Sequence, residues 1–181
     1  MTILLFGVSN VGKTTVGELL AAQLNFLFFD LDEEVKRRKN TTLEKFVSTG
    51  TLMERDLVRC DILLSLLQDT NDKVISVTPL SHMETIRNYL SAPNVLSIEL
   101  LDSPQNIFDR LVFSDENDVI YEDDDYKYEH MDYYLSEINK DLKWYGYVYT
   151  DIKNKFDIQG RTPTATVASL ISKFQLHKKD I

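Results

Sequence analysis

The sequence contains a single cysteine, and this scarcity excludes several kinds of protein. With Cys60 alone, no disulfide can form within the chain, and thiolates cannot build a zinc cluster. A reducing, cytoplasmic setting fits this composition. No run approaches the roughly 20 apolar residues of a membrane span, and the apolar run at residues 3–6 lacks the basic segment that precedes the core of a signal peptide. We therefore expect a cytoplasmic protein without a membrane partner.

Positive charge is also scarce: 20 Lys and Arg residues stand against 29 Asp and Glu, for a net charge of −9. An acidic body repels nucleic acid and anionic membranes, so neither is expected as a partner. Nine acidic residues and one lysine fall within residues 115–132. We interpret residues 113–132 as an acidic lid-like insert in a single domain that covers residues 1–181, and we expect a monomer.

Short apolar runs alternate with stretches of helical periodicity along the whole chain. Strands are predicted at residues 3–6, 26–29, 74–77, 95–101 and 156–158, and helices at 13–24, 33–38, 43–47, 52–67, 83–90, 104–112, 131–147 and 163–174. Such alternation predicts an α/β fold with three layers, in which helices cover both faces of a five-stranded, mostly parallel sheet.

The segment after the first predicted strand carries the clearest chemical signal. Residues 7–14 read Gly-Val-Ser-Asn-Val-Gly-Lys-Thr, which matches the phosphate-binding pattern G-x-x-x-x-G-K-[ST]. Its glycines allow backbone angles that let successive N–H groups converge on a phosphate. In this pattern Lys13 reaches the β- and γ-phosphates, Thr14 ligates Mg²⁺ through its hydroxyl, and the next helix points its positive end at the anion. We predict binding of ATP and Mg²⁺ through Gly7, Ser9, Asn10, Val11, Gly12, Lys13, Thr14 and Thr15.

Two carboxylates follow the second predicted strand. Asp30 and Asp32 should point into the crevice at the carboxyl end of the sheet, where open parallel sheets bind ligands. One can hold the hydration shell of Mg²⁺, and the other can orient a substrate hydroxyl and accept its proton. The competing interpretation is a solvated turn, which we favour only for Glu33 and Glu34 at the start of the next helix.

The opening of the chain resembles that of the shikimate kinases. The resemblance covers residues 12–17 and 29–32, and it continues at Gly50-Thr51-Leu52-Met53-Glu54-Arg55, at 101–104 with Arg110, and at Gly160-Arg161-Thr162-Pro163. It implies a P-loop kinase fold, with ATP and Mg²⁺ as cofactors. It further implies that Asp30 serves the metal through water, and that Asp32, with Lys13, is catalytic and faces the substrate hydroxyls.

The same resemblance assigns three further positions. It implies that Arg55 binds the substrate carboxylate, for which a guanidinium is suited. Arg110 and Pro163 would enclose the adenine, the guanidinium stacking on the ring. A solvated helix residue remains the alternative for Arg55, and a surface residue at a helix end the alternative for Arg110.

The chain departs from that family at three places. Where the family has three glycines after the third strand, residues 78–80 read Thr-Pro-Leu. The family has a second arginine that binds the substrate carboxylate, and this chain has Tyr145 at that position. In the family, the lid carries an arginine that balances transition-state charge, whereas residues 113–132 of this chain contain no arginine. The nucleotide half of the site therefore matches the family, and the acceptor half and the lid differ.

Three functions remain open on this basis. The first is a small-molecule kinase that phosphorylates a hydroxyl of shikimate or of a related hydroxylated acceptor. The second is an ATP-binding regulatory module that has lost efficient transfer, which the lack of a lid arginine favours. The third, a nucleotide kinase or simple NTPase, is disfavoured because the acidic lid would repel a second nucleotide.

Overall fold

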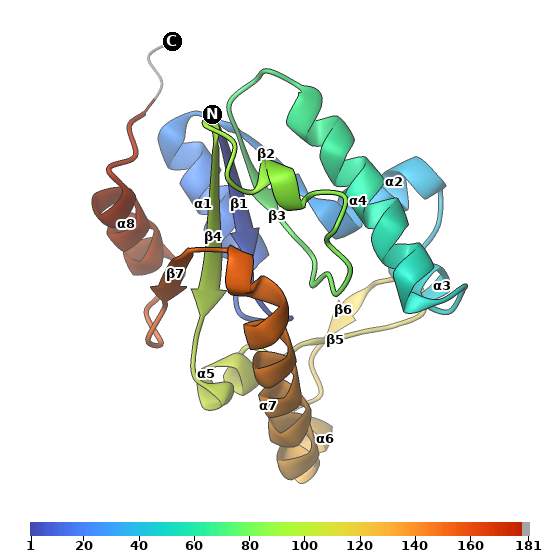
Figure 1. Ribbon diagram of the computed structural model, residues 1–181. Helices are drawn as coiled ribbons and strands as arrows, with labels where there is room; N and C mark the ends of the chain where they lie inside the picture. The colour runs from blue at the N-terminus through green and yellow to red at the C-terminus, as the bar shows by residue number, and fades with distance from the viewer. Residues whose placement is uncertain (179–181) are drawn as a thin grey trace.

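The computed structural model describes residues 1–178 and shows one central sheet between two helical layers (Figure 1). The end of the assigned domain range, residues 179–181, lies outside the described residues. The sheet has five parallel strands in the order β2-β3-β1-β4-β7. Their bounds are Thr2–Phe6 (β1), Leu27–Asp30 (β2), Lys73–Ser76 (β3), Val95–Leu101 (β4) and Asn154–Asp157 (β7). The predicted three-layer α/β fold with a five-stranded parallel sheet is confirmed.

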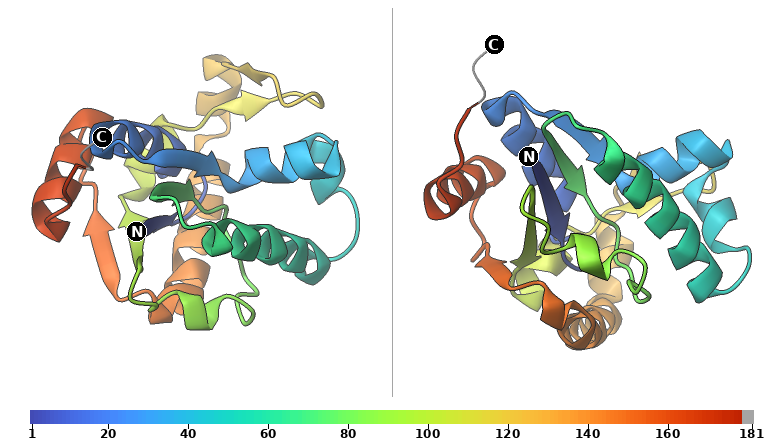
Figure 2. Two further views of the ribbon diagram at one scale, coloured as in Figure 1. Left: turned by 90° about the horizontal axis from the view of Figure 1, so that it is seen from above. Right: turned by 45° about the horizontal axis from the view of Figure 1, so that its top comes forward.

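The helices cover both faces of this sheet (Figure 2). One face carries α1 (Lys13–Leu24) and α8 (Pro163–Phe174), which pack against each other. The other face carries α4 (Leu52–Gln68), beside α2 (Leu31–Lys39) and α3 (Leu43–Val47). The remaining long helix, α7 (Met131–Val148), packs on α5 (Pro104–Asp109). Within residues 1–178, no helix combines the length and apolar character that crossing a bilayer requires.

The central strand β1 shows why the two layers form. All five of its residues are buried, and their side chains alternate between the faces. Ile3 and Leu5 enter the core beneath α1 and α8, whereas Leu4 and Phe6 enter the core beneath α4. Since β1 pairs with β3 on one side and β4 on the other, it has no free edge, and its end fixes the position of the loop that follows.

The helix predicted at residues 83–90 is wrong, because the structure has only a short 3₁₀ helix, Arg87–Tyr89. The prediction relied on Met83, Ile86 and Leu90, which are buried as expected. Their backbone hydrogen bonds span three residues, as in Ile86 N–H to the Met83 carbonyl and Tyr89 N–H to the Ile86 carbonyl. Successive 3₁₀ turns thus bury the same apolar spacing without an α-helix.

The acidic lid-like insert has defined secondary structure. It contains a two-stranded antiparallel hairpin, β5 (Phe113–Ser114) and β6 (Ile120–Tyr121), followed by the short helix α6 (Asp124–Glu129). Aromatic contacts hold the hairpin to the helices: the Phe113 ring lies 5.8 Å from the rings of Tyr121, Tyr126 and Tyr134. The hairpin extends toward α3, across the carboxyl ends of the strands (Figure 1).

Candidate active site

The loop between β1 and α1 has the backbone of an anion cradle. Gly7 and Gly12 have φ values of 140° and 106°, and Asn10 has φ 59°, a region that disfavours ordinary side chains. A Cβ on Gly7 would lie 2.6 Å from the Leu100 carbonyl oxygen, so a side chain cannot fit there. A Cβ on Gly12 would meet nothing within 4 Å. The two glycines therefore have different roles, since Gly7 allows close packing and Gly12 leaves space open beside the loop.

The Lys13 side chain is hydrogen-bonded to the backbone of this loop. Its side chain is 8% exposed, and Nζ donates hydrogen bonds to the carbonyl oxygens of Gly7 at 3.0 Å and Val8 at 2.8 Å. Burial lowers the pKa of Lys13 to about 8, opposed by the nearby carboxylates of Asp32 and Asp30. A phosphate bound at the loop would give this buried ammonium group a strong anionic partner.

The hydroxyl of Thr14 meets two other oxygen ligands at the ends of neighbouring strands. Thr14 Oγ1 donates to Asp30 Oδ2 at 2.7 Å and lies 3.4 Å from the Ser76 hydroxyl. Asp30 ends β2, and its Oδ1 also caps α2 by accepting from Asp32 N–H at 2.9 Å and Glu33 N–H at 3.3 Å. Neither the capping role of Asp30 nor the position of Ser76 beside Thr14 was predicted, although Ser76 is a small polar residue at the end of a strand.

These oxygens fit a magnesium site of the kind found in phosphotransferases. Mg²⁺ prefers oxygen ligands and commonly takes one or two protein groups, with water and substrate phosphates completing its shell. Thr14 and Asp30 supply a hydroxyl and a carboxylate at hydrogen-bond distance. Among residues 1–178, no group of three or more His, Cys, Asp or Glu side chains is arranged to hold a metal alone. The donor set thus suits a metal that arrives with a nucleotide.

Asp32 lies in the first turn of α2, two residues after the end of β2 and thus near the carboxyl end of that strand, as expected. Burial raises the pKa of its carboxyl, while the Arg59 guanidinium and the Thr78 side chain act in the opposite direction. Arg59 Nη2 lies 3.4 Å from Asp32 Oδ1, and the Asp32 side chain remains 27% exposed. The carboxylate can therefore still contact a bound molecule.

A cavity of about 760 Å³ joins these groups. Its lining includes Lys13, Thr14, Asp30 and Asp32, together with Arg110 and Pro163. Of the remaining predicted nucleotide contacts, Asn10, Gly12 and Thr15 line it as well. The volume lies within the range of small-molecule and cofactor sites.

The end of the cavity near Arg110 is held by a buried carboxylate. Asp102 is 7% exposed and accepts hydrogen bonds from Arg110 Nη2 at 2.6 Å, Asn106 Nδ2 at 2.6 Å and Gly160 N–H at 3.2 Å. Arg110 Nη1 also donates to the Val11 carbonyl at 3.4 Å. Asp102 thus fixes the Arg110 side chain and ties α5 to the turn before Pro163, although the sequence reasoning gave it no role.

The hairpin of the lid-like insert, which was not predicted as a hairpin, lines one side of this cavity. Val112, Phe113 and Ile120 contribute apolar lining. At the hairpin turn, Asp118 Oδ2 accepts from Leu43 N–H at 2.7 Å and lies 3.7 Å from Lys36 Nζ. The acidic insert is therefore anchored to α2 and α3 through one carboxylate, and the other acidic residues of the turn stay exposed.

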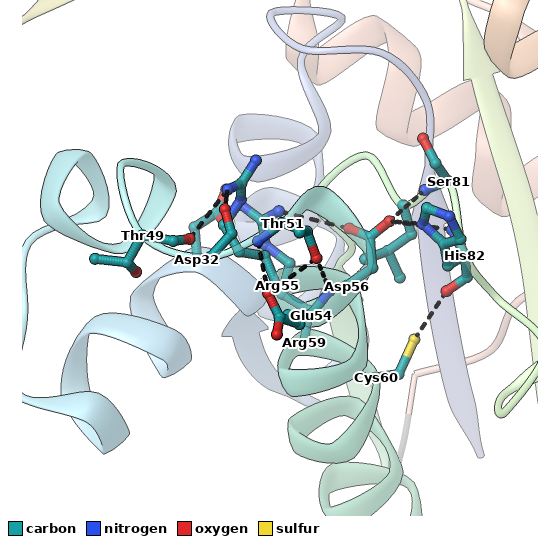
Figure 3. Close-up of polar contacts among 12 residues, drawn as sticks. Asp32, Thr49, Thr51, Glu54, Arg55, Asp56, Arg59, Cys60, Ser81 and His82 are labelled. Carbon is teal, nitrogen blue, oxygen red and sulfur yellow. Dashed lines mark hydrogen bonds and ion pairs between the residues drawn. The ribbon is translucent and has the colours of Figure 1, made fainter.

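Arg55 does not reach Asp32 in this structure. Its Nη1 donates to the carbonyl oxygens of Thr49 at 3.1 Å and Gly50 at 2.9 Å, just before α4 begins (Figure 3). The arginine beside Asp32 is Arg59, one helical turn further along α4. The role predicted for Arg55 in carboxylate binding remains untested.

Comparison with known proteins identifies the relationship. The family model for shikimate kinase matches residues 9–173. The chain belongs to the shikimate kinase family. It is 36% identical over 76 residues to a shikimate kinase of Bacillus pumilus, and 44% identical over 48 residues to the pentafunctional AROM polypeptide of Schizosaccharomyces japonicus. These alignments cover 41% and 26% of this chain, but only 40% and 3% of the two relatives.

Solved structures agree with this assignment at the level of the fold. The shikimate kinase of Bacteroides thetaiotaomicron superposes with a TM-score of 0.79, at 21% identity, over 97% of this chain and 99% of that one. The fold of this shikimate kinase family member is therefore that of the whole family domain.

One departure from the family pattern has a clear structural consequence. In the segment that replaces the three glycines, Thr78 and Leu80 are buried, and Leu80 N–H donates to the Tyr149 hydroxyl at 3.0 Å. Side chains thus fill the space beside the acceptor end of the site. Thr78 and Leu80 of this family member thus carry buried side chains where the family pattern has glycines.

Proposed function

We propose that this chain is an ATP- and Mg²⁺-dependent kinase that phosphorylates a hydroxyl of shikimate or of a closely related hydroxylated acid. The observation that carries the proposal is that the Asp32 carboxylate lines the same cavity as Lys13 and Thr14. A group able to orient a hydroxyl and the groups that hold a triphosphate are thus brought together. Membership of the shikimate kinase family, and the description of its relatives as shikimate kinases, support the choice of acceptor.

In the proposed reaction, Asp32 orients the acceptor hydroxyl and accepts its proton while the hydroxyl oxygen bonds to the γ-phosphorus. The bond from the γ-phosphorus to the β,γ-bridging oxygen breaks, and the electron pair leaves with ADP. Lys13 stabilises the negative charge that develops on the phosphoryl oxygens and on the leaving group. Thr14 and Asp30 would hold Mg²⁺, which supplies further charge neutralisation when bound. Arg110 and Pro163 would enclose the adenine at the far end of the cavity.

The proposal is tested by measuring ADP release with ATP and Mg²⁺, in the absence and presence of shikimate and of a panel of polyols and sugar acids. We expect an acceptor to accelerate release, and phosphorylated acceptor to form in equal amount. Tight ATP binding without acceleration by any acceptor would instead support a regulatory module, which the arginine-free lid favours. Rapid ADP release without an acceptor would support a simple NTPase.

The variant Asp32→Asn distinguishes ATP binding from phosphoryl transfer. The amide keeps the shape of the side chain but cannot accept a proton, so kcat should fall by about 10²–10⁴-fold. The dissociation constant of ATP, measured by calorimetry, should change by less than about threefold. Glu33→Gln, one position along the same helix turn, provides the matched control. Undiminished transfer by Asp32→Asn would contradict the role given to Asp32.

A further inference from the structure

Three cationic side chains line the cavity, and two of them are fixed by the protein itself. Lys13 donates to two backbone carbonyl oxygens of the phosphate loop, and Arg110 pairs with the buried Asp102 carboxylate at 2.6 Å. The third is Lys36, on α2. Four carboxylates line the same cavity: Asp30, Asp32, Glu33 and Asp118. A bound triphosphate would add further negative charge, so each cation of the cavity matters for holding it.

The partners of Lys36 leave it free to turn. Lys36 Nζ lies 2.6 Å from Glu33 Oε1, but the Glu33 side chain is 68% exposed, and an ion pair in water contributes little stability. Nζ also lies 3.7 Å from Asp118 Oδ2, which is beyond hydrogen-bond distance. That oxygen already accepts from Leu43 N–H at 2.7 Å. Lys36 can therefore change partners without breaking a buried contact.

Lys36 also has the charge and the position that a phosphate contact requires. It follows Asp32 by four residues on α2, and residues four apart lie on the same face of a helix. The hydrogen bond to Glu33 raises the pKa of Lys36 against the effect of burial, and the carboxylates of Asp118 and Asp30 act in the same direction as Glu33. Lys36 is therefore cationic at neutral pH, on the helix face that carries Asp32 into the cavity.

The lid-like insert offers little positive charge of its own. Residues 113–132 contain no arginine and one lysine, Lys127. Its side chain is buried, and Nζ donates to the Asp109 carbonyl oxygen at 3.0 Å. Nζ also lies 5.2 Å from the centre of the Phe108 ring. Lys127 thus attaches the insert to α5, and a cation for the terminal phosphate of a nucleotide has to come from another element.

We propose that Lys36 binds the terminal phosphate of ATP, leaving Glu33 and Asp118, and remains on this group during transfer. The inference rests on the proposed kinase function. Lysine suits this role because its ammonium group is a point charge on a flexible stem and has three donors for phosphate oxygens. Together with Lys13, it would stabilise the negative charge that develops on the transferring phosphoryl oxygens.

The test compares ATP with ADP, because these two nucleotides differ only in the phosphate that Lys36 would bind. Calorimetry with Mg²⁺ gives both affinities in the unchanged protein and in Lys36→Met, which keeps an unbranched stem but lacks the charge. The ratio of ATP affinity to ADP affinity should fall by about tenfold in Lys36→Met. It should fall by less than about threefold in Lys36→Arg, which keeps the charge. Lys39→Met, at an exposed lysine that ends the same helix, should leave the ratio within about twofold.

A second variant distinguishes a phosphate contact from a lid contact. If Lys36 serves only to hold Asp118, then Lys36→Met and Asp118→Ala should both weaken ATP and ADP alike and leave the ratio unchanged. Under the proposal, Lys36→Met lowers the ratio, whereas Asp118→Ala weakens both nucleotides by a similar factor. An unaltered ratio in Lys36→Met, or an equal fall in Lys39→Met, would overturn the inference. Thermal unfolding establishes that each variant is folded.

Phosphoryl transfer gives a second readout. With an acceptor that is phosphorylated, kcat at saturating ATP should fall by about 10²-fold in Lys36→Met and recover in part in Lys36→Arg. A kcat within about threefold of that of the unchanged protein would contradict a contact that persists during transfer. Failure to phosphorylate any acceptor would count against the proposed function alone, and the ratio of ATP to ADP affinity would still decide whether Lys36 binds the terminal phosphate.

Discussion

The nucleotide end of the site, which is the phosphate loop, and its acceptor end, which is the region around Asp32, are assembled in different ways. The nucleotide end comes mainly from one continuous segment, residues 7–15, whose position follows from the buried strand β1 and from the start of α1. The acceptor end brings together side chains from α2, α4 and the loop after β3. They are Asp32, Arg59 and His82, which lie 23 to 50 residues apart in the sequence. The nucleotide end depends on the conformation of the backbone, whereas the acceptor end depends on which side chains occupy a few separate positions.

This difference explains why one end matches the family pattern while the other has diverged. In a backbone cradle, most side chains are free to vary, but the glycines and the lysine are not. At the acceptor end, each contact depends on the side chain at a separate position, as with Asp32 and Arg59. The comparison predicts that changes at the nucleotide end abolish all activity, whereas changes at the acceptor end alter selectivity.

The largest effect should come from Lys13→Ala. The change removes the buried amine that faces the phosphates, so ATP affinity and kcat/KM should both fall by about 10²–10³-fold. Calorimetry with ATP and Mg²⁺ and the coupled ADP assay measure the two quantities. Lys45→Ala, an exposed lysine on α3, is the control. Unchanged ATP affinity in Lys13→Ala would break the comparison, because the nucleotide end would then not depend on its loop.

An effect of intermediate size is expected at Asp102, the carboxylate that positions Arg110. In Asp102→Asn, an amide N–H group would face donors from Asn106 and Gly160, so the free energy of unfolding should fall by about 2–3 kcal/mol. Urea denaturation measures this change. Asp109→Asn, at an exposed residue that ends α5, should alter stability by about 0.5 kcal/mol or less.

The same carboxylate should contribute to acid sensitivity. Although burial raises the pKa of Asp102, hydrogen bonds from Asn106 and Arg110 outweigh burial and hold that pKa below its ordinary value of 3.8. Its stabilising contribution is therefore complete above about pH 4 and is lost as the pH falls through the lowered value. Asp102→Asn should flatten the decline in stability below pH 4, and an unaltered acid limb would contradict the assignment.

Most of the fold could be predicted, because each strand is a short apolar run and helices separate the strands. The phosphate loop could be predicted as well, since its chemistry depends on local spacing. The contact between Arg59 and Asp32 could not, because Arg55 and Arg59 are one helical turn apart and only packing decides which of them faces Asp32. The contact by which Asp118 anchors the lid could not be predicted either. Nine acidic residues occur in this segment, and the sequence does not indicate which of them has a bonding partner.

The smallest effect should come from this lid contact. Asp118→Ala removes the acceptor of the Leu43 N–H group and the partner of Lys36, and it places alanine at φ 60°. Loss of about 1 kcal/mol of lid closure would raise KM for ATP by about fivefold. Glu116→Ala, exposed in the same turn, is the control. Hydrogen exchange at Leu43 reports opening directly, and unchanged protection there would show that the lid is held by its aromatic contacts alone.

The hydrogen bond from Leu80 N–H to the Tyr149 hydroxyl has a practical consequence for redesign. It joins the segment that follows β3 to a fully buried ring in the core beneath α4. Replacing residues 78–80 with glycine would make the backbone more flexible, but the hydrogen bond from the backbone N–H of residue 80 to the Tyr149 hydroxyl would remain. Enlarging this end to admit bulkier acceptors would therefore start with Tyr149→Phe, which releases the loop while keeping the ring that packs against Phe6.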